Sequence, residues 1–139
     1  MLDIACNLLG AALLLPLGMA LGSFFELVLD RVPRGESVLW PPSHCRACGR
    51  RLTVDELIPV VSYLAQHGRC RACETPIGAG VPVREAWSGL VVAVPWAIVG
   101  CGHPGFAAVV GTVLLLGMWV TRAVREIRRP SAAGKRPPV

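Results

Sequence analysis

The chain has 139 residues, of which 53% are hydrophobic and 17% charged, a balance too apolar for an average soluble domain. Its formal net charge of +5 would suit nucleic acid or an anionic membrane surface. All 14 Lys and Arg lie within 31–84 and 122–136, and this segregation follows the positive-inside rule, which favours a membrane partner and no nucleic acid.

The first predicted element, residues 1–29, is a transmembrane helix. Its apolar run from Ile4 to Leu29 can cross about 30 Å of hydrocarbon at about 1.5 Å per residue. A cleaved signal peptide is the alternative, but the segment lacks a basic start and a convincing small-residue cleavage site. Glu26 is the only ionisable residue inside the run. An acid at membrane depth is a functional candidate, and pairing with Arg31 in headgroup water is its simpler role.

Residues 30–85 carry two C-x2-C pairs, Cys45-Arg-Ala-Cys48 and Cys70-Arg-Ala-Cys73, separated by 21 residues. Two such knuckles can close a tetrahedral site of four thiolates, the geometry that structural zinc prefers. The positive-inside rule places this arginine-bearing loop in the cytoplasm, where thiols are kept reduced. Zinc is therefore favoured over the alternatives, which are two disulfides or bare thiols. The sequence therefore predicts a cytoplasmic zinc domain in which all four cysteines are ligands.

Two histidines and a possible helix start also lie in this loop. His44 and His67 could each replace a thiolate, but four suitably spaced cysteines place them outside the expected ligand set. Residues 53–56 have the form of a capping box. Since Pro59 is too near for a helix begun there, we expect a short helix from Pro59 to about Gln66.

Residues 86–121 predict a helical hairpin that crosses and recrosses the bilayer. Two apolar arms, 86–99 and 106–121, flank a dense turn signal. A soluble hairpin with a buried face is the alternative, which the lack of a polar stripe on either arm disfavours. Glu85, at the mouth of the second span, is another functional candidate or a partner of Arg84.

The remaining segments complete an expected topology of three spans. Residues 122–139 read as a basic cytoplasmic tail that binds anionic lipid and is disordered beyond Pro130. Cys6 and Cys101 are expected to be small apolar residues in or near the bilayer. The predicted fold class is thus an all-α membrane protein with three transmembrane helices, the N-terminus outside, and a small zinc-knuckle domain and the C-terminus in the cytoplasm.

Five segments occur in a defined order: GSFFELVLDRVP (22–33), SHCRACG (43–49), IPVVSYL (58–64), GRCRAC (68–73) and PVRE (82–85). Together they resemble the N-terminal domain of bacterial type IV prepilin peptidases. The resemblance implies an inner-membrane protein whose zinc loop helps to shape the site for prepilins. Full-length members cut the leader peptide with two aspartates, and many methylate the new N-terminus with S-adenosylmethionine. Glu26, Arg31 and Glu85 fall in matching segments, although Glu26 stands where the family has asparagine.

The family's catalytic pattern is not found in this sequence. An aspartyl dyad needs two carboxylates that share a proton, whereas the chain has only Asp3, Asp30 and Asp55 and no G-x-G-D segment. We therefore expect no catalytic residue here, but a module for processing prepilin-like substrates of type IV pili or type II secretion, beside an aspartyl-protease half on another chain. The alternatives are a non-enzymatic zinc-bearing membrane adaptor and a standalone S-adenosylmethionine-dependent N-methyltransferase, for which a Gly-rich cofactor motif is missing.

Overall fold

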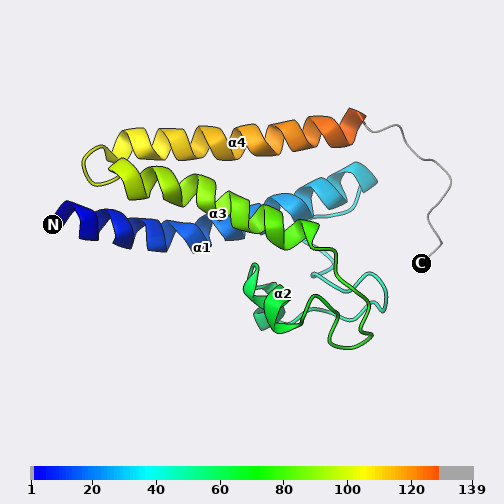
Figure 1. Cartoon of the computed structure of the whole chain (residues 1–139). Coiled ribbons are helices and arrows are strands. Elements are labelled where there is room, and N and C mark those ends of the chain that lie inside the picture. Colours follow the sequence, from blue (N-terminus) through cyan, green and yellow to red (C-terminus); the bar gives the residue numbers. More distant parts are fainter. Residues whose placement is uncertain (1, 129–139) are drawn as a thin grey trace.

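The computed structural model describes residues 2–128. The elements run in the order α1 (Leu2–Arg31), η1 (Val32–Arg34), η2 (Val54–Leu57), α2 (Val61–Ala65), α3 (Gly80–Val99) and α4 (Pro104–Arg128). α1, α3 and α4 lie side by side, and the cysteine loop extends from one end of them (Figure 1). The described part contains two isolated β-bridges and no strand, so the prediction of a helical fold is confirmed. The predicted disorder beyond Pro130 lies outside the described residues.

Among residues 2–128, two helices are long and apolar enough to cross a membrane: α1 with η1, over Leu2–Arg34, and α4. Only 6% of the first apolar window and 22% of the second is buried inside the protein, whereas a core helix of a soluble protein is mostly buried. α3 packs along both of them. Of the three predicted spans, the first and the third thus correspond to helices that could cross a membrane.

Small residues lie where these helices meet. A Cβ atom added to Gly18 of α1 would approach the Ser88 carbonyl oxygen of α3 to 2.7 Å and the Gly89 Cα to 2.9 Å, so larger side chains are excluded. Large apolar side chains point outward instead, among them Leu13 and Phe106, which are 67% and 65% exposed. Small residues inside and large apolar residues outside are typical of helices packed in lipid.

Several element boundaries differ from those predicted, and α3 begins at Gly80, six residues before the predicted start of the second span. The 3-10 helix η2 follows Thr53 directly, so the expectation that no helix begins there was wrong. η2 ends before Pro59 because Ile58 is extended, with φ −70° and ψ 115°, as the residue before a proline prefers. The expected short helix is correspondingly confined to α2. At the other end, α4 continues past Thr121 to Arg128, so the first part of the basic tail is helical.

Cys6 and Cys101 form a disulfide, with their Cα atoms 6.2 Å apart. The expectation that each is a small apolar residue in or near the bilayer did not include this bond. The turn between α3 and α4 folds back beside the first turns of α1, at the end of the bundle away from the cysteine loop (Figure 1). The Cys101 N–H also donates a 2.7 Å hydrogen bond to Oδ1 of Asn7.

Candidate metal centre

The two cysteine knuckles share one backbone arrangement. In each, the residue after the second cysteine donates its N–H to the carbonyl of the first cysteine, from Gly49 to Cys45 at 2.8 Å and from Glu74 to Cys70 at 3.0 Å. Gly49 and Glu74 both have positive φ, 72° and 55°. This left-handed residue closes each turn tightly, so that the two thiols of a knuckle lie together.

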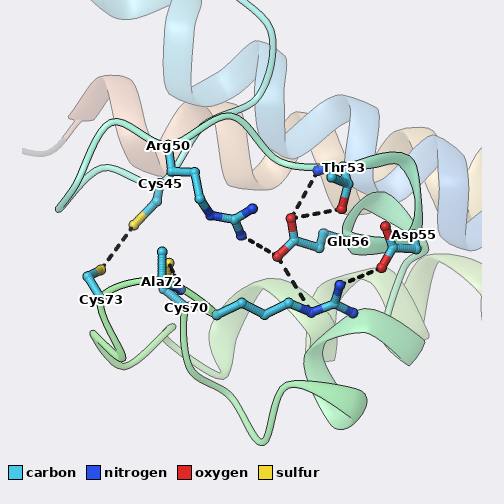
Figure 2. A network of polar contacts seen from close by, with 9 residues as sticks. Cys45, Arg50, Thr53, Asp55, Glu56, Cys70, Ala72 and Cys73 are labelled. Atoms are coloured by element: carbon cyan, nitrogen blue, oxygen red, sulfur yellow. Dashed lines mark hydrogen bonds and ion pairs between the residues drawn. The ribbon is translucent and has the colours of Figure 1, made fainter.

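All four knuckle thiols converge on one point. Their sulfur atoms lie within 4.8 Å of one another, and the Sγ atoms of Cys45 and Cys73 are 3.8 Å apart. A tetrahedron with Zn–S bonds of about 2.3 Å has an edge of about 3.8 Å. Figure 2 shows Cys45 and Cys73 pointing toward one another across the centre. None of the four is in a disulfide, so the cluster can hold a metal ion.

The thiols of the cluster differ in pKa because their hydrogen bonds differ. Backbone N–H groups of Cys73 and then Ala72 lower the pKa of the buried Cys70 thiol to about 6. At Cys48 the Arg50 N–H acts in the same direction, but the neighbouring thiols, Cys73 first, raise the pKa to about 11. Four thiols this close cannot all ionise alone, because the thiolates repel one another. A bound cation removes that obstacle, and the donor set therefore fits a metal such as zinc.

Glu56 connects the two knuckles. Its Oε1 lies 2.5 Å from Nη2 of Arg50 beside the first knuckle and 3.7 Å from Nε of Arg71 within the second. Its Oε2 accepts a 2.9 Å hydrogen bond from the Thr53 N–H. The Glu56 side chain is fully buried, and Arg50, then the Thr53 N–H, lower its pKa to about 2 (Figure 2). The capping-box pattern marked Glu56 in the sequence, but gave no sign that it joins two arginines.

The two histidines are both exposed and outside the thiol cluster. Nδ1 of His44 lies 3.0 Å from the Pro42 carbonyl oxygen. His67 has a φ of 51° in the turn after α2.

Glu26 has partners other than the predicted Arg31. It pairs with Arg84 of α3 and with Nε of Arg122 of α4, the latter at 3.2 Å, so one carboxylate of α1 joins three helices. Arg31 is 5% exposed and donates a 2.8 Å hydrogen bond to the carbonyl of Ser37. Arg31 thus fixes the chain as it leaves α1.

Glu85 is also bound differently from the expected pairing with Arg84. It is 6% exposed and its Oε2 accepts a 2.9 Å hydrogen bond from the backbone N–H of Val60. This contact links the cysteine loop to α3. The structure therefore places Glu26 and Glu85 at contacts between elements, and their roles toward a substrate stay predictions.

The three aspartates of the chain have different surroundings. Asp30 pairs with Arg34 and Arg46, and Asp55 lies 2.6 Å from Nη1 of Arg71. Asp3 is in the first turn of α1, at the opposite end of that helix from Asp30. Asp30 and Asp55 are thus each paired with arginine and not with another carboxylate.

Residues 17–99 match the model of the bacterial peptidase A24 N-terminal domain. The match extends from within α1 to the end of α3 and includes the whole cysteine loop. No solved structure matches the chain.

Curated relatives carry the name prepilin leader peptidase/N-methyltransferase. One from Myxococcus xanthus is 42% identical over 81 residues, covering 58% of this chain and 24% of the relative. One from Burkholderia pseudomallei is 34% identical over 127 residues, covering 73% and 41%, and one from Bacillus subtilis is 36% identical over 104 residues, covering 75% and 42%. The chain thus spans less than half the length of these relatives. The resemblance inferred from the five sequence segments is confirmed, and the chain belongs to the bacterial peptidase A24 N-terminal domain family.

Proposed function

We propose that this chain is a module for the processing of prepilin-like precursors, by leader cleavage, N-methylation or both. The observation that carries the proposal is the family match over 17–99, within which all four clustered cysteines lie. The relatives' name joins a prepilin leader peptidase to an N-methyltransferase. The family resemblance implies S-adenosylmethionine as the methyl donor for the N-methylation.

The proposed location is a bacterial plasma membrane, which the chain crosses three times. α3 has 20 residues, a length of about 30 Å, and lies between two helices that are apolar enough to span. The C-terminal end of α4, whose sequence includes Arg122, Arg125 and Arg128, lies at the same end of the bundle as the arginine-rich cysteine loop (Figure 1). By the positive-inside rule this end faces the cytoplasm and the opposite end faces outward.

In this proposal the metal of the four cysteines is zinc, and its role is structural. Four thiolates fill a tetrahedral ion and leave no position for a reactive water. Arg50 and Arg71 bring positive charge beside the thiolates, and Glu56 holds both arginines in place. The zinc loop would present a fixed surface beside the membrane to the precursor.

The hydrolytic carboxylates of this proposal are supplied from outside these 139 residues. Asp30 and Asp55 are each engaged by arginines, and Asp3 is remote from both. Hydrolysis by a dyad requires two carboxylates in contact. An aspartyl-protease half therefore has to complete the enzyme.

The test uses cells that lack prepilin peptidase activity and contain a pilin precursor. The chain is expressed alone, and together with the aspartate-bearing remainder of a full-length relative. We expect cleavage only in the second case, seen by mass spectrometry as loss of the leader, and copurification of the two parts. The matched control carries Cys45→Ser and Cys73→Ser in this chain, which should abolish cleavage.

Other outcomes of this experiment distinguish the alternatives. A crosslink to the precursor without cleavage or methylation, with the remainder present, would favour the zinc-bearing adaptor. Methylation of a pre-cleaved pilin by the chain alone, with binding of S-adenosylmethionine in isothermal titration, would favour the methyltransferase. The absence of copurification and of processing would contradict the proposal.

A further inference from the structure

The two cysteines outside the metal cluster occupy the opposite end of the molecule. Cys6 lies in the second turn of α1 and Cys101 in the turn between α3 and α4. Their disulfide joins positions 95 residues apart in sequence, and both are at least partly exposed. The other four cysteines are free thiols and gather in the loop at the far end. One chain thus carries oxidised sulfur at one end and reduced sulfur at the other.

We propose that Cys6–Cys101 is an extracytoplasmic disulfide that clamps α1 to the α3–α4 turn. A reducing cytoplasm keeps thiols free, whereas the space outside the bacterial plasma membrane allows disulfides to form and persist. The two redox states therefore place the two ends in different compartments. The assignment of the compartment rests on the proposed membrane topology, but the disulfide itself does not.

Near the disulfide, two glycines allow α1 and the end of α3 to lie close together. A Cβ atom on Gly10 of α1 would overlap the indole of Trp96, and one on Gly100 would lie 2.6 Å from Cδ2 of the same ring. Trp96 thus fills the space that both glycines leave, and brings α1 close to the end of α3. The hydrogen bond from the Cys101 N–H to Asn7 fixes the turn beside α1. The Cα separation of 6.2 Å lies within the range that a disulfide accepts, about 4.4–6.8 Å.

Formation of the bond requires an oxidant, which here is a protein disulfide of the extracytoplasmic compartment. The thiolate of one cysteine attacks that disulfide and forms a mixed disulfide, releasing one sulfur of the oxidant as a thiolate. The second cysteine of the pair, after losing its proton, attacks the mixed disulfide and displaces the oxidant. The products are the Cys6–Cys101 disulfide and the oxidant in its reduced, dithiol form. The two protons lost by the cysteines are taken up by that dithiol, so the number of free protons does not change.

The disulfide is tested by cutting the full chain in the exposed cysteine loop with a protease, in membranes prepared with a thiol-blocking reagent. Cleavage separates a fragment with α1 from a fragment with α3 and α4. We expect the two to migrate together on a gel without reductant and apart with reductant. The matched Cys6→Ser chain should give separate fragments in both conditions. Separate fragments from the native chain without reductant would overturn the disulfide.

A second measurement tests the compartment. Spheroplasts are treated with a membrane-impermeant reductant and then with an impermeant maleimide. We expect Cys6 and Cys101 to be labelled in spheroplasts and to stay unlabelled in inverted membrane vesicles. Labelling in inverted vesicles alone would overturn the extracytoplasmic assignment and the proposed topology, while the linked fragments would still establish the bond. A third measurement uses cells that lack the extracytoplasmic protein oxidant. We expect the Cys6–Cys101 bond to be absent in those cells. A bond that still forms without the oxidant would overturn the proposed route of formation.

Discussion

The backbone N–H of Val60 donates a 2.9 Å hydrogen bond to Oε2 of Glu85, and this contact joins the cysteine loop to α3. Val60 has φ 60° and ψ −48°, and the Val61 N–H reaches back to the Pro59 carbonyl at 2.6 Å. This is a γ-turn of the rare, strained kind, on a β-branched residue. A buried carboxylate therefore holds a strained turn where the loop meets the helices.

Replacing Glu85 should loosen this junction. Glu85→Ala leaves the Val60 N–H without its acceptor, so we expect a loss of about 1–3 kcal/mol in the local stability of the loop. Hydrogen exchange in detergent should accelerate at the Val60 and Val61 amides. Glu85→Gln keeps a carbonyl oxygen and should lose less. Unchanged exchange at both amides in Glu85→Ala would contradict the role of this contact.

Removal of a knuckle cysteine should remove the metal. In purified protein we expect about one zinc per chain, and loss of most of it in Cys45→Ser and in Cys73→Ser, because three thiolates close the site poorly. The control is Cys6→Ser, which is remote from the cluster and should keep its zinc. Metal analysis by mass spectrometry decides the matter, and full zinc retention in both knuckle variants would exclude ligation by four thiolates.

The order of the helices and the convergence of the two cysteine knuckles could be predicted from the sequence. Apolar length and turn residues are local signals, and they predicted the positions of α1, α3 and α4. The C-x2-C spacing is local as well, since each pair lies on one turn. Convergence of both pairs required only the known preference of zinc for four thiolates.

Contacts between distant segments were not accessible in the same way. Glu26 meets Arg84 and Arg122 only because of the rotation of three helices about their axes, which no periodicity in nearly uniform apolar segments specifies. The pairing of Cys6 with Cys101 depends likewise on the alignment of α1 with the hairpin turn. The sequence shows an acid within an apolar segment and two cysteines outside the knuckles, but it does not show which residues they contact.

The two knuckles provide an internal comparison of the left-handed position. Glu74 occupies it in the second knuckle, where the first has Gly49. A residue with a Cβ atom pays about 1–2 kcal/mol for this conformation, so Gly49→Ala should destabilise the zinc-bound loop by about this amount. Glu74→Gly should stabilise it by up to about 1 kcal/mol, since glycine also costs entropy.

Thermal unfolding of the zinc-bound protein measures both changes. Glu74→Ala is the matched control, because it removes the carboxylate and retains the Cβ atom. It should behave like the native chain at this position. Equal stabilisation by Glu74→Gly and Glu74→Ala would show that charge, and not backbone conformation, is responsible.

Glu56 predicts a specific dependence on pH. Its pKa is about 2 in the folded loop and 4.5 ordinarily, chiefly because of the hydrogen bond from Arg50. A lowered pKa means that the stabilisation is complete above about pH 4.5 and is lost as the pH falls toward about 2. In Glu56→Gln we expect a loss of about 2–3 kcal/mol at pH 7 and a shrinking difference from the native chain below pH 4.5.

The measurement compares the native chain with Glu56→Gln, both loaded with zinc and held in the same excess of zinc, because the metal supports the fold of the loop. The acid release of zinc then acts on both chains, and their difference reports the contribution of Glu56. Denaturant unfolding of the loop, followed from pH 7 to pH 3, gives the free energies. A difference that stays constant over this range would show that the Glu56 charge does not support the loop.

Glu26 is predicted to stabilise the helix bundle by holding Arg84 and Arg122. Its side chain is 13% exposed and the two arginines are about one-third exposed, so solvent weakens the pairing. We expect Glu26→Ala to lower bundle stability in detergent by about 1–2 kcal/mol. Combining it with Arg122→Leu should cost less than the sum of the two single changes, because one of the two arginines that Glu26→Ala leaves unpaired is then removed.

The substitution Glu26→Asn separates this structural role from one toward the precursor. Asparagine, the residue usual in the family at this position, accepts a hydrogen bond from one arginine but does not neutralise two. If Glu26 acts only between helices, Glu26→Asn should lower the thermal midpoint and leave the rate of leader cleavage unchanged in the completed enzyme. A changed cleavage rate at an unchanged midpoint would instead place Glu26 in contact with the precursor. Phe25, whose ring stacks on that of Trp119 with 5.4 Å between the ring centroids, gives the control: Phe25→Leu should lower the midpoint by loss of packing, with Glu26 intact.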